Sequence, residues 1–325
     1  GMPRCPDRRD LTILCAHPAY KVAQTLARRA PDLRVLSATT ADEARAHLPA
    51  ADVLCVSGLW RDDWLARAPK LRFVQSISAG VDQFVKAAFE AAGVRLASAQ
   101  GANATAVAQH ALALILALSR RLHLARDLQA RADWIGMAKT PATREDELTG
   151  KTLVVVGFGG IGARLGDYAR ALGMKVIAVK RDVARLGGAA DEIVATEQLH
   201  EVLPRADYVA LTCPLTPQTR GLIDAAALAA MKPGAALVNV ARGAVVDEPA
   251  LIAALAAGKL AAAGLDCFVE EPLPADSPLW GFPNVIVTHH VGGETRAYED
   301  NVVDILLDNL ARLERGDPHL RNEVV

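Results

Sequence analysis

The chain has 325 residues, which at about 150 residues per domain predicts two domains. Its 36 Lys and Arg residues nearly balance 37 Asp and Glu residues, and the net charge of −1 excludes a strongly basic protein that binds nucleic acid or an acidic membrane surface. Hydrophobic residues make up 51% of the chain, which is a globular composition and excludes a disordered one.

The first part of the chain alternates short apolar runs with Ala- and Arg-rich stretches of helical character, which predicts a parallel α/β sheet. The predicted strands lie at residues 11–15, 33–36, 52–56 and 71–76. From Asn103, apolar residues recur at intervals of three and four as far as Ala125, which predicts one long helix. The polar stretch 131–150 then reads as a loop or arm, and it carries Trp134.

A second α/β series follows, and a last helix is expected over residues 294–314. The strands of this series are predicted at residues 153–156, 176–179, 208–211, 236–240, 263–265 and 285–288. We expect two doubly wound, Rossmann-like or flavodoxin-like domains with parallel sheets, the second inserted in the first. The first domain then comprises residues 1–101 and 296–325, and the inserted domain comprises residues 102–295.

Several classes of protein and of site are not expected. The longest clean apolar run, residues 111–118, is shorter than the roughly 18 residues of a membrane span. Residues 1–4 lack the apolar stretch of a signal peptide, so a cytoplasmic protein is expected. The cysteines form an odd set of five without a C-x-x-C pair, and no H-E-x-x-H motif occurs, so neither a disulfide framework nor a bound metal is expected.

A glycine-rich motif follows the predicted strand 153–156. Gly157, Gly159 and Gly162 form G-x-G-x-x-G, with Gly160 and Ile161 between them, and helical sequence comes next. In this context the first glycine allows a tight turn, the second lets the backbone approach a pyrophosphate, and the third lets the helix pack against the strand. The positive end of the helix then holds the phosphates. The motif predicts a dinucleotide-binding site.

The residues at the end of the next strand indicate which nicotinamide dinucleotide is bound. A carboxylate at this point accepts hydrogen bonds from the ribose hydroxyls and repels a 2′-phosphate. Here Lys180 and Arg181 stand there, and two cations suit a 2′-phosphate. NADP(H) is therefore favoured. NAD(H) remains the alternative, in which both cations are solvated and Asp182 serves the ribose.

Three further segments follow later strands of the same series. They are N-x-x-R-G at residues 239–243, D-x-F-x-x-E-P at residues 266–272 and H-x-x-G-x-T at residues 290–295. In this order the chain resembles the D-isomer-specific 2-hydroxyacid dehydrogenases. Shorter matches at residues 78–82, 103–108, 213–216 and 278–280 extend the resemblance over nearly the whole chain.

The chemistry of these residue types agrees with the resemblance, because reduction of a 2-oxoacid needs a cation for the carboxylate and a proton donor at the carbonyl oxygen. Arg242 supplies a planar, bidentate cation. His290 supplies the proton, since imidazole titrates near neutral pH. Glu271 is expected to orient the imidazole and stabilise its charged form. His289 and Glu270, the neighbouring residues, fall one position too early in the family's register.

The resemblance implies further binding residues and a site between the two domains. The amides around Ala79 and Gly80 are expected to hold the substrate carboxylate, and Asp266 to face the nicotinamide carboxamide. Other residues expected at the cofactor are Thr105, Cys213, Pro214, Thr219, Val240, Ala241, His290 and Gly292. Trp134 resembles a tryptophan that glyoxylate and hydroxypyruvate reductases project toward a partner's active site, and the family implies a homodimer.

The expected function is reduction of a small 2-oxoacid to a D-2-hydroxyacid, with glyoxylate and hydroxypyruvate as the leading substrates. Two alternatives remain open. Relatives that act as transcriptional co-repressors carry the same three residues, so the chain is alternatively a nicotinamide-sensing binding protein. A relative that oxidises phosphite uses the same Arg, Glu and His, so phosphite oxidation is the second alternative.

Overall fold

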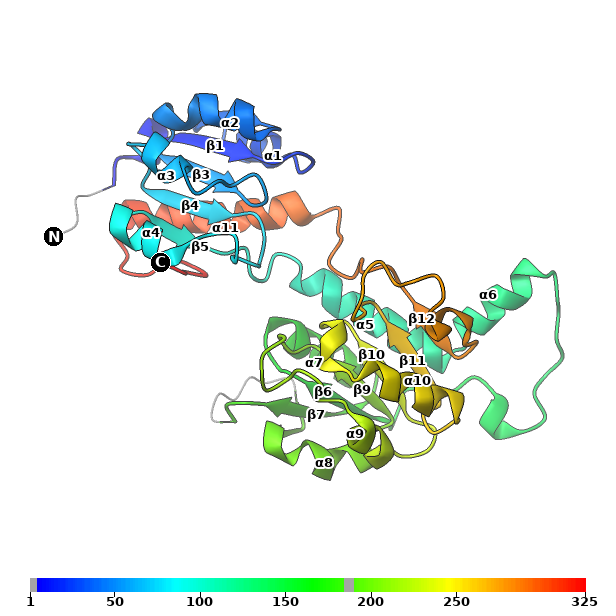
Figure 1. Cartoon of the computed structure of the whole chain (residues 1–325). Coiled ribbons are helices and arrows are strands. Elements are labelled where there is room, and N and C mark those ends of the chain that lie inside the picture. The colour runs from blue at the N-terminus through cyan, green and yellow to red at the C-terminus, as the bar shows by residue number, and fades with distance from the viewer. Residues whose placement is uncertain (1–4, 184–189) are drawn as a thin grey trace. The chain divides into compact units, whose positions relative to one another are not determined.

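The computed structural model describes residues 5–183 and 190–325 and divides the chain into two compact units (Figure 1). Unit 1 comprises Gly1–Asn103 and Thr295–Val325, and unit 2 comprises Ala104–Glu294. The sequence placed these borders at residues 101/102 and 295/296. Residues 1–4, on which the expectation of no signal peptide depends, lie outside the described residues. Each unit contains one parallel sheet with helices on both faces, which confirms the predicted α/β fold class.

The sheet of unit 1 has five parallel strands in the order β2-β1-β3-β4-β5. The strands are β1 (Thr12–Ala16), β2 (Arg34–Ala38), β3 (Val53–Val56), β4 (Phe73–Ser76) and β5 (Arg95–Ala97). The helices are α1 (Val22–Arg29), α2 (Ala41–His47), α3 (Trp64–Arg67), α4 (Lys86–Ala92) and α11 (Tyr298–Arg315). Successive side chains of a strand point to opposite faces, so Ile13 joins the core under α1 and α11, whereas Leu14 joins the core on the opposite face.

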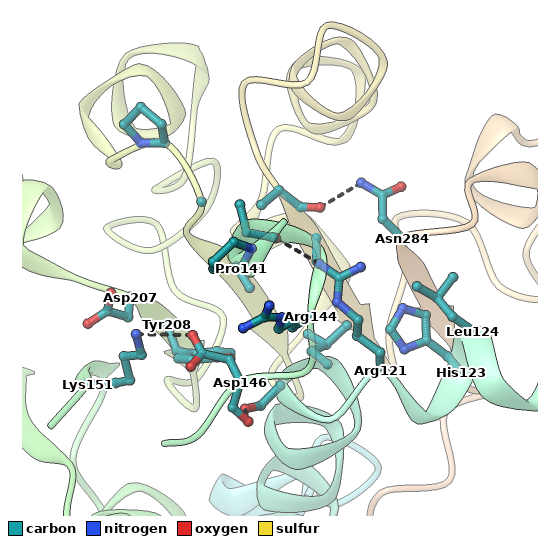
Figure 2. Close-up of a pocket in the computed structure, with 18 residues that line it drawn as sticks. Arg121, His123, Leu124, Pro141, Arg144, Asp146, Lys151, Asp207, Tyr208 and Asn284 are labelled. Atoms are coloured by element: carbon teal, nitrogen blue, oxygen red, sulfur yellow. Dashed lines mark hydrogen bonds and ion pairs between the residues drawn. The ribbon is translucent and has the colours of Figure 1, made fainter. Parts of the chain in front are cut away.

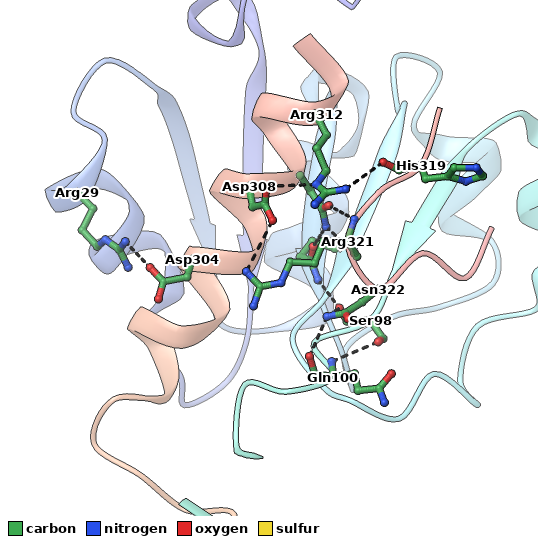
Figure 3. Close-up of polar contacts among 11 residues, drawn as sticks. Arg29, Ser98, Gln100, Asp304, Asp308, Arg312, His319, Arg321 and Asn322 are labelled. Carbon is green, nitrogen blue, oxygen red and sulfur yellow. Dashed lines mark hydrogen bonds and ion pairs between the residues drawn. The ribbon is translucent and has the colours of Figure 1, made fainter. Parts of the chain in front are cut away.

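The carboxyl-terminal segment completes unit 1 through polar contacts (Figure 3). Asn309 of α11 is fully buried; its amide nitrogen donates to Oε1 of Gln75 at 2.9 Å and to the Arg321 carbonyl at 3.1 Å. Its amide oxygen accepts the Arg321 N–H at 2.7 Å. The side chain of Asn322 then donates to the carbonyl of Ser98. The last residues are thereby fixed beside β5.

The sheet of unit 2 has seven parallel strands in the order β12-β11-β10-β9-β6-β7-β8. The strands are β6 (Thr152–Val156), β7 (Lys175–Lys180), β8 (Glu192–Ala195), β9 (Tyr208–Leu211), β10 (Ala236–Asn239), β11 (Ala262–Leu265) and β12 (Val285–Val287). The helices are α5 (Ala104–Ser119), α6 (Leu122–Ala130), α7 (Gly160–Ala171), α8 (Leu199–Val202), α9 (Ala225–Ala230) and α10 (Glu248–Ala256). The strand order reverses between β6 and β9, which is where such sheets bind ligands.

The central strands of unit 2 are buried on both faces. Leu153 and Val155 of β6 join the core under α5 and α7, whereas Val154 and Val156 join the core on the other face. This explains why β6 reads as a continuous apolar run rather than as an alternating one.

The expected single helix from Asn103 to Ala125 is wrong, because the structure breaks it between α5 and α6. Arg121 adopts a left-handed conformation with a φ of 53°. At this point the hydroxyl of Ser119 and the guanidinium of Arg120 both donate to the Asp146 carbonyl. The returning chain thus captures the end of α5, and α6 leaves in a new direction with no buried residue (Figure 1).

No helix within the described ranges combines the length and the apolar character that crossing a membrane requires.

Candidate active site

The glycine-rich turn connects β6 to α7 at the reversal of the strand order. Gly157 has a φ of 82°, and a Cβ there would stand 2.6 Å from Cα of Cys213. A Cβ at Gly162 would stand 2.4 Å from the Gly157 oxygen, so neither position has room for a side chain. Among the described residues, a Cβ at Gly159 would meet nothing within 4 Å beyond its chain neighbours. The open space beside Gly159, at the amino end of α7, fits the pyrophosphate of a dinucleotide.

Other residues predicted at the cofactor surround this turn. Gly160 and Ile161 form the first turn of α7, and a Cβ at Gly160 would lie 3.9 Å from that of Ala104. The exposed Thr105 is the next residue of α5, so it lies near the same turn.

The loop after β9 passes behind the glycine-rich turn. Burial raises the pKa of the Cys213 thiol to about 11, which keeps it neutral. The hydroxyl of Thr219 donates to the Pro214 carbonyl at 2.7 Å and accepts the Thr216 N–H at 2.8 Å. Cys213, Pro214 and Thr219 therefore lie in one tight loop beside the turn.

The two cations predicted to select the cofactor lie at the carboxyl end of β7, the neighbour of β6. Lys180 is the last residue of the strand and is half-buried, and Arg181 is exposed. Asp182 follows and is also exposed.

Arg242 lies in the loop after β10, which Asn239 holds in place. Asn239 is buried, its amide nitrogen donates to the Arg242 carbonyl, and its oxygen accepts the Ala241 N–H at 3.0 Å. A Cβ at Gly243 would stand 2.0 Å from the Phe268 carbonyl carbon, so this loop packs against the one after β11. The backbone at Val240 and Ala241 is buried, whereas the Arg242 residue is exposed.

Glu271 and His290 form a direct pair. The Glu271 carboxylate lies 2.6 Å from Nδ1 of His290 through one oxygen and accepts the Phe268 N–H at 2.9 Å through the other. His290 has a φ of 56°, a conformation that non-glycine residues rarely adopt. With Nδ1 facing Glu271, Nε2 is the nitrogen that is left to serve a substrate oxygen. A partly exposed imidazole held by a carboxylate is suited to general acid–base work.

The charged groups of the later loops gather around the buried thiol of Cys267. Burial raises its pKa far above the ordinary value, the charges of Asp266 and Glu271 raise it further, and Arg242 lowers it. Asp266, Glu271 and Arg242, from three different loops, therefore lie within electrostatic reach of one atom, and Glu271 connects His290 to them.

Asp266 is turned toward the loop that follows His290. Its carboxylate accepts the N–H groups of Val291 and Gly292 at 2.9 and 3.0 Å and the hydroxyl of Thr288 at 2.7 Å. Its expected contact with a nicotinamide carboxamide stays a prediction.

The expected carboxylate-binding segment of unit 1 follows β4. The hydroxyl of Ser78 donates to the Gly80 carbonyl at 2.7 Å, and the hydroxyl of Ser76 donates to the Ser78 carbonyl at 2.9 Å. Ala79 and Gly80 are exposed, and among the described residues no acceptor takes their N–H groups. Two successive free N–H groups in a fixed loop are suited to binding an anion.

Trp134 lies on the arm after α6 and is 97% exposed. Met137 is 94% exposed and Ile135 62% exposed, and both line one open groove of about 1050 Å³ together with Leu124 and Leu128. In this chain the tryptophan therefore belongs to an uncovered apolar surface.

A separate cavity of about 660 Å³ lies at the opposite edge of the unit 2 sheet, where the strands begin (Figure 2). Its wall contains Tyr208, the first residue of β9, and Lys151, which pairs with Asp146 at 3.1 Å. Arg121 donates to the Ala142 carbonyl and Arg144 donates to the Ala138 carbonyl. None of the predicted site residues lines this cavity.

Sequence reasoning missed the residues that hold the site's loops, namely Asn239 and Thr288. Asn239 opens the N-x-x-R-G motif, so the motif itself carried the signal; Thr288 gave none, because a strand-end threonine is common. Among the described residues, no three His, Cys, Asp or Glu side chains are grouped to hold a metal ion.

Comparison with known proteins shows the family of the chain. Residues 112–292 match the family model for the NAD-binding domain of the D-isomer-specific 2-hydroxyacid dehydrogenases. Glyoxylate/hydroxypyruvate reductase B of Citrobacter koseri is 36% identical over 88% of this chain and 87% of its own length. D-3-phosphoglycerate dehydrogenase of Mycobacterium tuberculosis is 38% identical over 83% of this chain, but the match takes up only 50% of that protein.

A solved structure shows the same fold over nearly the whole chain. The D-isomer-specific 2-hydroxyacid dehydrogenase of Xanthobacter autotrophicus, crystallised with NADPH and MES, is 29% identical and superposes with a TM-score of 0.76 over 97% of this chain and 98% of that one. The chain belongs to the D-isomer-specific 2-hydroxyacid dehydrogenase family.

Proposed function

We propose that this chain reduces a small 2-oxoacid to the D-2-hydroxyacid, with a nicotinamide dinucleotide as hydride donor. The observation that carries the proposal is the Glu271–His290 pair at 2.6 Å, in loops of the same unit as a glycine-rich turn that fits a pyrophosphate. A bound nicotinamide supplies the hydride. The chain itself supplies the proton, the positive charge and the binding groups.

His290 gives its Nε2 proton to the carbonyl oxygen as the hydride arrives at the carbon. Glu271 accepts a hydrogen bond from Nδ1 and stabilises the charged ring before the transfer. A positioned acid of this kind contributes roughly 10²–10⁴-fold to the rate. Arg242 binds the substrate carboxylate and polarises the carbonyl beside it, for which a planar guanidinium is suited.

Glyoxylate or hydroxypyruvate is the proposed substrate. The free N–H groups of Ala79 and Gly80 support a carboxylate-binding role for the loop after β4. The Citrobacter relative carries the name of both activities, and the mycobacterial relative is a phosphoglycerate dehydrogenase. Phosphohydroxypyruvate therefore belongs in any panel of substrates.

NADPH is the proposed cofactor, with NADH as the alternative. Lys180 and Arg181 stand at the carboxyl end of β7, where they meet the ribose of a dinucleotide bound on the neighbouring turn. A relative of the same fold has been crystallised with NADPH. In the alternative, Asp182 accepts the ribose hydroxyls.

A homodimer is the proposed assembly, formed through α6 and the arm after it. The helix buries no residue, and Trp134, Ile135 and Met137 form an exposed apolar surface that a monomer rarely leaves uncovered. Trp134 is further proposed to reach the substrate of the partner subunit. A Trp134→Ala variant tests the two roles separately, because loss of substrate contact raises KM whereas loss of the dimer changes the sedimentation. A cytoplasmic location completes the proposal, since all five cysteines are free thiols.

The test is loss of the reduced-nicotinamide absorbance with glyoxylate, hydroxypyruvate, pyruvate and 3-phosphohydroxypyruvate, each with NADPH and with NADH. His290→Gln should abolish turnover, and the adjacent exposed His289→Gln is the matched control that should not. No turnover with any oxoacid, despite tight dinucleotide binding, would overturn the proposal in favour of a sensor protein. Turnover with phosphite and oxidised cofactor alone would assign phosphite oxidation instead.

A further inference from the structure

Three side chains from different elements of unit 2 form one hydrogen-bonded chain behind His290. His110 lies on α5, Thr288 directly after β12, and Asp266 directly after β11. Nε2 of His110 is 3.0 Å from the Thr288 hydroxyl, which is 2.7 Å from Oδ1 of Asp266. The Asp266 carboxylate then accepts the N–H groups of Val291 and Gly292.

The direction of these hydrogen bonds follows from the groups themselves. The Asp266 carboxylate accepts two backbone amides, and the Thr288 hydroxyl donates to its Oδ1. That hydroxyl has only one proton and therefore accepts from His110. The imidazole of His110 consequently carries a proton on Nε2, which also lies 3.5 Å from Oδ1 of Asp266, so His110 reaches the carboxylate both through Thr288 and directly.

The end of this chain is the backbone that follows the catalytic histidine. His290 is held at a φ of 56°, a strained conformation for a residue with a side chain, which persists only where neighbouring contacts determine it. The two N–H groups that follow it both point at one buried carboxylate. A Cβ at Gly292 would stand 2.8 Å from Oδ2 of Asp266, so the Gly292 backbone and this carboxylate are too close together for a side chain at Gly292.

These hydrogen bonds also connect the segment by which the backbone enters unit 2 to the segment by which it leaves. Helix α5 starts at Ala104, where the chain enters unit 2, and the loop after His290 leads to Glu294, where it leaves. His110 and Asp266 thus tie the entering helix to the leaving loop within unit 2.

We propose that His110 and Thr288 are positioning residues for His290. They hold the Asp266 carboxylate in the orientation that accepts both amides, and thereby fix the imidazole at Glu271. The catalytic consequence rests on the proposed function, because it requires that His290 be the acid. The structural consequence, protection of the Val291 and Gly292 amides, does not.

The test compares disruptive and conservative variants in the full chain. Thr288→Val and His110→Leu remove the hydrogen bonds, whereas Thr288→Ser and His110→Gln keep a hydroxyl and a terminal N–H donor. His200→Leu, on the exposed face of α8, is the matched control. Hydrogen exchange is followed by mass spectrometry on peptides covering residues 288–295 without added ligand, and kcat and KM are measured with the best substrate pair.

Both disruptive variants should exchange the amides of residues 291–292 about tenfold faster, which is the effect of losing one hydrogen bond. They should lower kcat about tenfold while KM for the dinucleotide stays within twofold of wild type. The conservative variants should recover most of both losses, which a general loss of stability would not explain. If Thr288→Val does not fold, the comparison rests on His110→Leu and His110→Gln, because His110 is partly exposed.

Unchanged exchange over residues 288–295 in His110→Leu would overturn the proposal, whatever happens to kcat. Faster exchange that spreads equally to peptides of β6 and β9 would also overturn it, because that result indicates global destabilisation. If local exchange is faster in the variants but the wild-type protein turns over no oxoacid, the proposed function is wrong and the positioning network stands.

Discussion

Glu271 connects the backbone after β11 to the imidazole of His290. One of its carboxylate oxygens accepts the Phe268 N–H at 2.9 Å, and the other lies 2.6 Å from Nδ1 of His290. The first contact fixes the carboxylate, so the second fixes the ring. This relationship separates the proposed function of Glu271 from that of its neighbour Glu270, whose side chain has no hydrogen-bond partner among the described residues.

Glu271→Gln is expected to lower kcat about 10²-fold, because a neutral amide keeps the shape of the contact but no longer stabilises the charged imidazole. Binding of the dinucleotide should be unchanged. The measurement is steady-state turnover together with fluorescence titration of the cofactor. Glu270→Gln is the matched control, and an equal loss in both variants would contradict the assigned pair.

The glycine-rich turn makes opposite predictions for two of its glycines. Gly162→Ala should lower the free energy of unfolding by about 1–3 kcal/mol, because the added carbon would stand 2.4 Å from the Gly157 oxygen. Gly159→Ala should leave stability nearly unchanged, since the added carbon meets open space, but should weaken dinucleotide binding at least tenfold. Thermal melting and cofactor titration check both. Tight dinucleotide binding by Gly159→Ala would show that the pyrophosphate does not bind beside Gly159.

The sequence predicted the central strands well because their burial on both faces leaves continuous apolar runs. It missed β5 and β8, which are edge strands of three and four residues. All residues of β8 are only half-buried, so no hydrophobic pattern marks them. The break between α5 and α6 was missed for a different reason, since it depends on contacts of Ser119 and Arg120 with the distant Asp146 carbonyl.

The same distinction applies to the site. Motif order singled out Arg242, Glu271 and His290 as candidates, because each follows a strand and its chemistry is specific to the residue type. The supporting contacts of Asn239 and Thr288 depend on which loops meet in three dimensions, and nothing in their spacing expresses this. The left-handed conformation of His290 was equally out of reach, since it follows from neighbours rather than from its own propensity.

Arg181→Ala is expected to lower kcat/KM for NADPH about tenfold or more, because a bidentate contact to a 2′-phosphate is lost. The value for NADH, which lacks that phosphate, should change by less than about twofold. Turnover with each cofactor at saturating oxoacid measures the ratio. An equal loss with both cofactors would show that Arg181 does not read the phosphate.

The thiols near the site should resist alkylation at pH 8. Burial raises the pKa of Cys213 to about 11, so the reactive thiolate is a minor form until the pH approaches that value. Cys267 has its pKa raised even further. Labelling with iodoacetamide, read by mass spectrometry, should leave both unmodified and the activity intact. Rapid labelling of Cys213 at pH 8 would contradict the buried, neutral thiol.

Asn309 provides a stability test in unit 1 that is independent of catalysis. Its fully buried amide satisfies Oε1 of Gln75 and both the N–H and the carbonyl of Arg321. Asn309→Leu has a similar volume but leaves these polar groups without their partner, which costs about 2–4 kcal/mol of unfolding free energy.

Urea unfolding of the full chain measures this cost, and Asn309→Asp serves as the comparison. The aspartate keeps an acceptor for the Arg321 N–H but repels the oxygen of Gln75, so it should also destabilise the fold. Asn301→Leu is a second comparison, because that half-buried side chain makes one hydrogen bond within the described residues, to the Ala102 carbonyl, and its loss should cost about 1 kcal/mol. A cost for Asn309→Leu no greater than that of Asn301→Leu would show that the carboxyl-terminal segment is held by apolar packing of α11 rather than by this amide.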